Sequence, residues 1–460
     1  MPLELQDQIE LGTGLKQIAV EVVERAIKAG ATAADAIARD GNEFSTLVRL
    51  GEVETLKESG ARALGLRVFV GKRAAATHTS DFSRDGIERL VSGAIALARA
   101  TSEDPDSGLP ERESLGSLKQ ELDLYYDDVY SLSTADRIDY ARRAERAAMQ
   151  VDSRITNSEG GSFDAATGYK VLANSLGFVG EYRRSYCSVS AIPIAQTEGA
   201  AMQRDYWYSA SRTIQKLETP ESVGRKAAER TLRRVGARKV ATQRVPIIFD
   251  PMVSRGLIDH IFDAINGDAI YRHASFLAGK IGEQIAGENI TIIDDGTMIG
   301  GFGSSPFDGE GVPTRRTVVV ERGVLKSYLL NTYTARKLKL ATTGNAARGL
   351  TGNPGIGSGN FYLQPGEKSP QEIIRNVRSG LYVTEFLGFG VNLVTGDFSR
   401  GASGLWIENG EFTFPVEEIT VAGNLKQMFR DISEIGNDLE FRSSLAAPTL
   451  RIDGMTVAGE

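Results

Sequence analysis

The stretch "VPIIFDPMVSRGLIDHIFDAING", residues 245–267, joins an apolar run to an amphipathic pattern. Its first five residues are typical of a buried strand. Asp250 suits the N-cap and Pro251 the first turn of a helix that Gly267 ends, since these residue types are favoured at those places. Apolar residues then recur at helical spacing, at Val253, Leu257, Ile258, Ile261, Phe262 and Ile265. We expect a strand followed by a helix that packs one face on a core.

The chain changes character around this stretch. Upstream, helices are predicted over residues 15–29, 84–100, 134–151 and 219–237, with short strands at 34–39, 44–50, 63–70, 74–79, 169–174, 178–182 and 187–194. Downstream, strands predominate, at residues 290–294, 317–321, 325–330, 361–363, 382–387, 405–408 and 449–452. Two Xaa-Gly pairs, Arg322 with Gly323 and Asn409 with Gly410, have the chemistry of hairpin turns.

The length of 460 residues exceeds what one hydrophobic core organises. The polar segment 101–116 is rich in proline, glycine and acid, which indicates a linker or exposed loop. We therefore predict an α+β protein with N-terminal and middle α/β-sandwich units followed by a strand-rich C-terminal domain. The predicted boundaries are 1–116, 117–240 and 241–460.

Composition narrows the class of protein. The net charge of −7 argues against direct nucleic-acid binding, which needs a basic face. The single cysteine, Cys187, excludes an intrachain disulfide, and residues 1–12 show no signal-peptide pattern. The sequence contains no run of 18 consecutive apolar residues, so no membrane-spanning helix is predicted. We expect a cytoplasmic protein.

Candidate metal ligands are few. The chain has three histidines, His78, His260 and His273, and no H-E-x-x-H or C-x-x-C motif. A site of His260 with Asp259 and Asp263, and with His273 further on, is conceivable, but Asp259 and Asp263 one turn apart are more typical of a solvated helix face. Four acids further on, Asp294, Asp295, Asp308 and Glu310, are compatible with a cation site, although their Asp-Gly and Glu-Gly contexts favour turns.

Several longer segments together carry a family resemblance. These are "GLRVFVGKRAAATHTSDFS", "DPMVSRGLID", "IIDDGTMIGGFGSSPFDGEGVPTRRTVVVERGVLKSYLLNTYTARKL", "TTGNAARG", "GDFSRGASGLWIENGEFTFPVEEITVAGNL" and "GNDLEF". In this order they resemble the TldD/PmbA family, a metallopeptidase family also described as modulators of DNA gyrase. The resemblance spans almost the whole chain and implies the fold of that family.

The resemblance also implies a division of labour. In the TldD branch, an H-E-x-x-x-H helix and a cysteine near the C-terminus bind a metal. The corresponding positions here hold Asp250, Pro251 and Arg255, and the cysteine region falls on "FRSSLAAP". The chain thus resembles the TldE/PmbA branch, which has no metal site of its own and leaves catalysis, with zinc, to a TldD-type partner.

The implied role is that of a non-catalytic subunit that closes a cavity around unfolded or short peptides. Arg255, Asp259 and His260 are the candidates for contact with substrate or partner. One alternative is a free-standing homodimeric factor that binds peptides or proteins without peptidase activity. Another is a hydrolase that uses Asp259 and His273.

Overall fold

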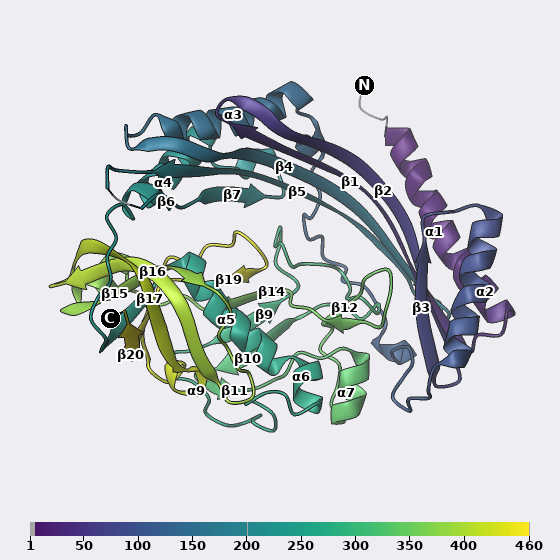
Figure 1. Ribbon diagram of the computed structural model, residues 1–460. Coiled ribbons are helices and arrows are strands. Elements are labelled where there is room, and N and C mark those ends of the chain that lie inside the picture. The colour runs from purple at the N-terminus through teal and green to yellow at the C-terminus, as the bar shows by residue number, and fades with distance from the viewer. Residues whose placement is uncertain (1–4, 200, 460) are drawn as a thin grey trace.

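The computed structural model describes residues 5–199 and 201–459, so the first four residues of the N-terminal stretch lie outside it. One long, curved sheet arches over a compact C-terminal region (Figure 1). The sheet has the order β3-β2-β1-β4-β5-β6, and β7 pairs with β5. Its strands are β1 (Ala33–Arg49), β2 (Glu52–Val70), β3 (Arg73–Thr79), β4 (Ile155–Asn174), β5 (Val179–Ala195), β6 (Gln203–Arg204) and β7 (Trp207–Ser211).

The strands of this sheet are longer than the sequence predicts. The runs expected at 34–39 and 44–50 fall in β1 except for Leu50, and those at 178–182 and 187–194 fall in β5 except for Phe178. Gly41 lies inside β1 and is paired on both sides, with Ala61 of β2 and Gly168 of β4. The residues between the two predicted runs therefore continue the strand. The two predicted upstream units share this one sheet.

Four helices cover the convex face of the sheet (Figure 1). They are α1 (Leu5–Lys28), α2 (Arg84–Ala100), α3 (Thr134–Met149) and α4 (Pro220–Leu232). One core lies under α1 and α2, and a second lies under α3 and α4. Successive side chains of a strand point to opposite faces of the sheet. Every second side chain therefore faces the helices, and the others point to the concave side. Short 3₁₀ turns span Arg112–Ser114, Asp127–Tyr130 and Ile214–Lys216.

The C-terminal region contains two further sheets. The first has the order β17-β16-β15-β8-β20-β18, and β17 also pairs with β20, so the order closes on itself. Its strands are β8 (Gln243–Phe249), β15 (Ser379–Leu387), β16 (Asp397–Glu408), β17 (Glu411–Asn424), β18 (Ile432–Ile435) and β20 (Leu450–Ala458). The second, β11-β10-β9-β14-β19, consists of β9 (Ile292–Asp295), β10 (Arg316–Glu321), β11 (Val324–Leu325), β14 (Asn360–Leu363) and β19 (Leu445–Ala446).

Smaller elements complete this region: β12 (Ala346–Ala347), β13 (Gly355–Ile356), α6 (Gly267–Tyr271), α7 (Thr332–Leu338), α8 (Pro370–Arg375) and α9 (Leu425–Met428). Both predicted hairpin turns are confirmed. Arg322 and Gly323 have φ of 47° and 80°, and Asn409 and Gly410 have 53° and 83°. Two successive positive φ values match the turn type that two-residue hairpins favour.

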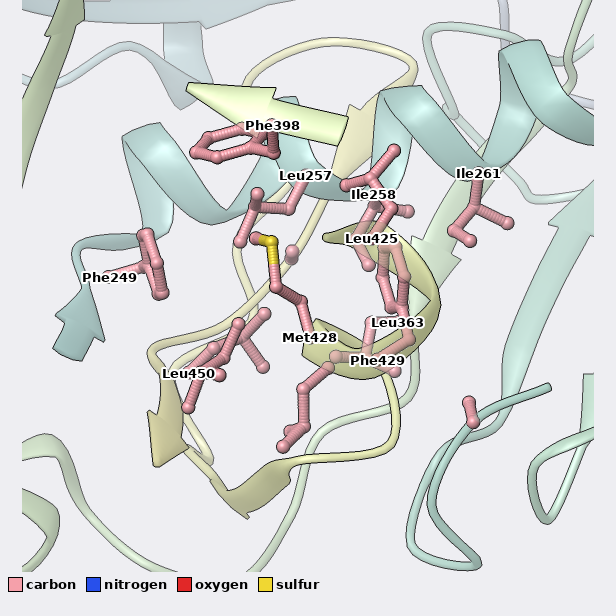
Figure 2. Packing of buried hydrophobic residues seen from close by; sticks show 14 of the residues in the cluster. Phe249, Leu257, Ile258, Ile261, Leu363, Phe398, Leu425, Met428, Phe429 and Leu450 are labelled. Atoms are coloured by element: carbon pink, nitrogen blue, oxygen red, sulfur yellow. The ribbon is translucent and has the colours of Figure 1, made fainter. Parts of the chain in front are cut away.

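Helix α5 (Pro251–Ile265) packs its apolar stripe on the main C-terminal core. Figure 2 shows Leu257, Ile258 and Ile261 facing Leu425, Met428 and Phe429. The prediction that Gly267 ends this helix is wrong, since α5 ends at Ile265 and Gly267 begins α6. A Cβ at Gly267 would lie 2.5 Å from Leu330 Cδ2, so glycine serves close packing there.

The predicted fold class is confirmed: helices and strands are mixed, and the C-terminal region is rich in strands. Among the described residues, no helix has the length and apolar character needed to cross a membrane.

Candidate functional site

The start of α5 is built from the two residues that the sequence singles out. The Asp250 side chain accepts a hydrogen bond from the backbone N–H of Met252 at 3.0 Å. This satisfies one of the donors that a helix leaves unpaired at its first turn. Pro251 occupies the first helical position, where its missing N–H costs nothing. The strand-to-helix turn is therefore well specified locally.

Asp250 also belongs to a buried cluster of charged groups. Arg230 of α4 donates to its carboxylate at 3.3 Å, and the Tyr382 hydroxyl of β15 donates at 3.1 Å. Arg230 also pairs with Asp205 at 3.4 Å, and Arg233 lies 3.9 Å from Asp250. Burial lowers the pKa of Arg230, but the charges of Asp250 and Asp205 outweigh it and raise that pKa overall. The negative charge of Asp250 is thus compensated by arginines of the same chain.

A pocket of about 210 Å³ opens beside this turn, which we call the α5 pocket. Asp250, Pro251 and Arg255 line one side of it, and Trp207 of β7 lines another. The segment 438–447 closes it. The two parts of the chain that the family resemblance assigns to metal ligands, the first turn of α5 and "FRSSLAAP", therefore meet at one pocket.

Besides Arg230, two further arginines line the α5 pocket, Arg255 and Arg442. Arg255 Nη1 donates to the Tyr208 hydroxyl at 3.0 Å. Arg442 lies 4.0 Å over the Trp207 ring, pairs with Glu440 at 2.6 Å and donates to the Tyr208 carbonyl. Sequence reasoning missed Arg442. It follows the quoted "GNDLEF" motif directly and lies within "FRSSLAAP", the segment that the resemblance aligns with the cysteine region.

The other two candidates for contact with substrate or partner, Asp259 and His260, differ in their surroundings on α5. Asp259 lies at the surface one turn beyond Arg255, where partial desolvation of its carboxylate raises its pKa and the charge of Arg255 opposes the shift. His260 is half-buried, and its ring lies 6.2 Å from that of Phe398. Burial, reinforced by the charge of Arg400, lowers the pKa of His260 to about 4. His260 is therefore neutral at pH 7 and packs toward β16.

Residues with metal-binding or nucleophilic chemistry are dispersed. His78 is exposed on β3, and His273 is exposed just after α6. Across residues 5–199 and 201–459, no three His, Cys, Asp or Glu residues are grouped to hold a metal ion. Cys187 is buried, and burial raises the pKa of its thiol to about 12, as suits a packed residue.

The four acids of the glycine-rich segment do not form a cluster of their own. Asp308 accepts hydrogen bonds from the backbone N–H groups of Glu310, Val312 and Ala346 at 2.8–3.0 Å. Burial and the neighbouring charge of Glu310 raise the pKa of Asp308 to about 7. Burial also raises the pKa of Asp294 to about 6.

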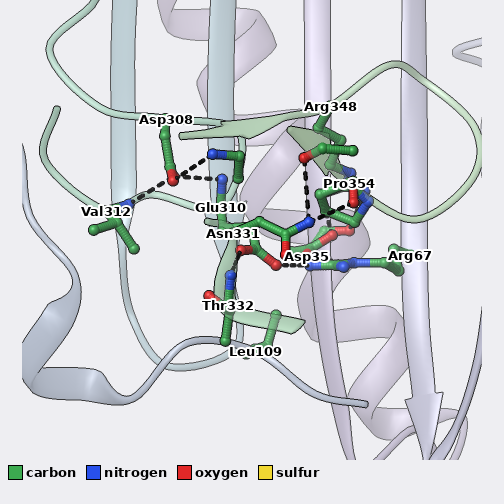
Figure 3. A network of polar contacts seen from close by, with 12 residues as sticks. Asp35, Arg67, Leu109, Asp308, Glu310, Val312, Asn331, Thr332, Arg348 and Pro354 are labelled. Carbon is green, nitrogen blue, oxygen red and sulfur yellow. Dashed lines mark hydrogen bonds and ion pairs between the residues drawn. The ribbon is translucent and has the colours of Figure 1, made fainter. Parts of the chain in front are cut away.

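Glu310 belongs to an ion network that joins the long sheet to the C-terminal region (Figure 3). It accepts a hydrogen bond from the Thr332 N–H at 2.9 Å and lies 3.6 Å from Arg67 of β2. Arg67 and Arg348 both pair with Asp35 of β1. Asp308 and Glu310 thus have structural partners within the chain.

Comparison with known proteins gives consistent matches. Models of the PmbA/TldA metallopeptidase family match residues 34–98 (domain 1), 127–235 (central domain) and 242–459 (C-terminal domain). The chain is 40% identical to "Metalloprotease PmbA" of Escherichia coli O157:H7, over 91% of this chain and 90% of that protein.

Solved structures agree. A Bacteroides thetaiotaomicron protein named a "putative modulator of DNA gyrase" superposes with a TM-score of 0.90 at 30% identity, over 97% of this chain and 99% of the other. TldE from Thermococcus kodakarensis has the same fold, with a TM-score of 0.86 at 21% identity over 95% and 99% of the two chains.

Proposed function

The chain belongs to the PmbA/TldA metallopeptidase family, and from this membership we propose that it is the TldE/PmbA-type, non-catalytic subunit of a cytoplasmic TldD–TldE peptidase. In this proposal a TldD-type partner supplies zinc and catalysis. This chain closes the cavity around unfolded or short peptides. The observation that carries the proposal is the chemistry of the α5 pocket, at the place where the resemblance puts metal ligands.

The donor groups of the α5 pocket do not fit a zinc ion. Zinc sites in proteins use three or four thiolate, imidazole or carboxylate ligands. The carboxylates here are already held: Asp250 by Arg230 and Tyr382, Glu440 by Arg442, and Asp438 by Thr449 at 2.8–2.9 Å. Arg255 adds a permanent positive charge, which opposes a cation by Coulomb repulsion.

A subunit of this kind needs an interface, and exposed apolar side chains support one. The end of β15 and the loop that leads to β16 expose three large apolar side chains. These are Leu387, Phe389 and Val394, with exposed fractions of 50%, 108% and 57%. Clustered exposed apolar residues are typical of surfaces that bind other proteins. We propose that this loop contacts the TldD-type partner.

The test is co-expression of this chain with its H-E-x-x-x-H paralogue, followed by purification, metal analysis and a peptidase assay on unfolded protein and short peptides. We expect one stable complex that contains zinc and cleaves peptides, while this chain alone binds no stoichiometric zinc and is inactive. Zinc-dependent cleavage by this chain alone would contradict the proposal. A homodimer that ignores the paralogue would favour the free-standing binding factor.

Arg255→Ala tests the contact role within the same complex. Because Arg255 lines the α5 pocket and donates a hydrogen bond to the Tyr208 hydroxyl, its loss should leave the fold intact and lower partner binding or complex activity at least severalfold. Arg272→Ala, which removes an exposed arginine just after α6, is the matched control and should change neither. Equal behaviour of the two variants would make Arg255 an ordinary surface residue.

A further inference from the structure

A second pocket, of about 520 Å³, lies on the concave face of the long sheet. Strands β1, β2, β4 and β5 form its floor, and Phe302 and Leu350 of the C-terminal region form part of its wall. Four basic side chains line it: Arg39, Lys170, Arg184 and Arg212. We call these four residues the cationic pocket. The family resemblance and the α5 pocket do not account for them.

The strand register brings these charges together. Arg39 of β1 pairs directly with Lys170 of β4, and Lys170 pairs with Tyr182 of β5. One step along the same face, Gly41 pairs with Gly168, and Gly168 with Arg184. The glycines leave the floor open in the row where Arg184 projects. The hollow is therefore built by residue type and register together.

The arrangement is unfavourable without a ligand. Like charges at directly paired positions of a sheet destabilise it. Yet among the described residues none of the four basic groups forms an ion pair with a carboxylate of the chain, whereas neighbouring Arg62 pairs with Asp40 on the opposite face at 2.8 Å. Burial, together with Arg39 and Arg184, lowers the pKa of Lys170. The fold thus holds positive charge that it does not neutralise.

Arg212 shows that the pocket is built rather than incidental. It is 6% exposed, and its guanidinium donates to the carbonyls of Ser185, Gly301 and Phe302 at 2.8–3.0 Å. Its Nε is buried and has no hydrogen-bond partner in the described structure. Burial and the charge of Arg184 lower the pKa of Arg212 to about 10. The pocket wall thus contains a buried guanidinium whose positive charge is met only by backbone carbonyls, and an anion in the pocket would compensate that charge.

The walls of the pocket indicate which anion suits it. Tyr182, Tyr186 and Phe302 provide aromatic surface beside the charges, and Ala61 and Ala63 provide small apolar floor. Glu43 lies at one end, in register with Ala166, and would repel a long polyanion. Nucleic-acid binding requires a positively charged groove that follows the phosphate backbone. The positive charge here is instead confined to one pocket. A single carboxylate next to apolar side chains matches these features.

We propose that the cationic pocket binds a carboxylate of a short peptide, so that this chain anchors peptide ligands by their negative end. This proposal rests on the proposed function above, in which the chain binds unfolded or short peptides, and it specifies which group of the peptide is bound. The α-carboxylate of a peptide and an acidic side chain share this chemistry. Backbone pairing tolerates varied sequences, and a charged anchor would add a defined end to such binding.

The experiment measures peptide binding to the isolated full chain by fluorescence anisotropy. The probes are a dansylated apolar tetrapeptide as the free acid, the same peptide as the C-terminal amide, and an amide that carries one glutamate side chain. We expect the free acid to bind about tenfold or more tightly than the amide, with binding weakened by salt. Recovery of affinity by the glutamate-containing amide would assign the side chain as the source, and no recovery would assign the terminus.

Paired variants assign the effect to the pocket. Lys170→Met combined with Arg184→Gln should abolish the preference for the acid, while the melting temperature stays unchanged or rises because repulsion is relieved. Arg183→Gln removes the same charge from the adjacent residue on the opposite face and should keep the preference. Equal binding of all three peptides, no binding, or a preference that survives the double variant would overturn the proposal. Because no partner or peptidase activity is needed, these outcomes are separate from failure of the proposed complex.

Discussion

Two titratable residues at α5, Asp250 and His260, are accommodated in opposite ways, one as a compensated charge and the other as a neutral ring. Asp250 at its start is a buried anion compensated by Arg230 and the Tyr382 hydroxyl. His260, nearly three turns later, is kept neutral because burial and the charge of Arg400 lower its pKa, and its Nε2 has no hydrogen-bond partner among the described residues. A buried acid with partners and a buried base without them respond to pH in different ways.

His260 should make the protein less stable as the pH falls. Its pKa is about 4 in the folded chain and near 6.5 when exposed, so the unfolded state binds the extra proton over this range. Stability is therefore lost as pH decreases from about 6.5 towards 4. His260→Phe should flatten this loss in thermal melts between pH 4 and 7. His78→Phe, at an exposed position, should follow the wild-type slope, and a wild-type slope for His260→Phe would contradict the assignment.

At the scale of the strand, β1 depends on Gly41 for its continuity. A Cβ at Gly41 would lie 2.7 Å from the Thr167 carbonyl oxygen of β4, which cannot move without breaking the register. Gly41→Ala should lower the free energy of unfolding by about 1–3 kcal/mol, the usual cost of overpacking. Urea denaturation followed by far-ultraviolet circular dichroism measures this.

Gly168→Ala is the matched control for that strand, because a Cβ at Gly168 meets only the Arg184 side chain at 3.7 Å. We expect stability to stay equal or to rise slightly as the unfolded chain loses freedom. If both alanine variants behave alike, close approach of the two backbones is not what requires Gly41.

The same strand shows what sequence patterns can and cannot predict. Helix α2 was predicted over Arg84–Ala100 with its observed bounds, because its cap and its apolar spacing are local. The two separate strands predicted at 34–39 and 44–50 are one strand in the structure, because Gly41 and its neighbours are paired on both sides by distant segments that no local pattern reveals. The α5 pocket could be anticipated only through family resemblance. The cationic pocket depends on cross-strand register between distant segments, and no local pattern records that.

At the scale of the whole molecule, the long sheet and the C-terminal region are joined by charges as well as by packing. Ile37, Leu172 and Phe307 form a small apolar contact between them. Beside it, Arg348 of the C-terminal region pairs with Asp35, which also binds Arg67 (Figure 3). The backbone carbonyl of Arg348 accepts a hydrogen bond from Arg39 Nη2 at 2.7 Å. The junction therefore also positions one member of the cationic pocket.

Arg348→Met should loosen this junction and disturb that pocket together. Asp35 would retain Arg67 but lose its second partner, which we expect to cost about 3 kcal/mol, at the low end for a broken buried ion pair. Hydrogen exchange should quicken in β1 and β2 near residues 35–39 and 63–67, and affinity for the free-acid peptide should fall because Arg39 is held less firmly. Arg322→Met, which removes an exposed arginine paired with exposed Glu288, should leave both unchanged. Faster exchange with unaltered peptide affinity would show that the junction stabilises the sheet without positioning Arg39. Unchanged exchange would mean that the Arg348–Asp35 ion pair does not stabilise the junction.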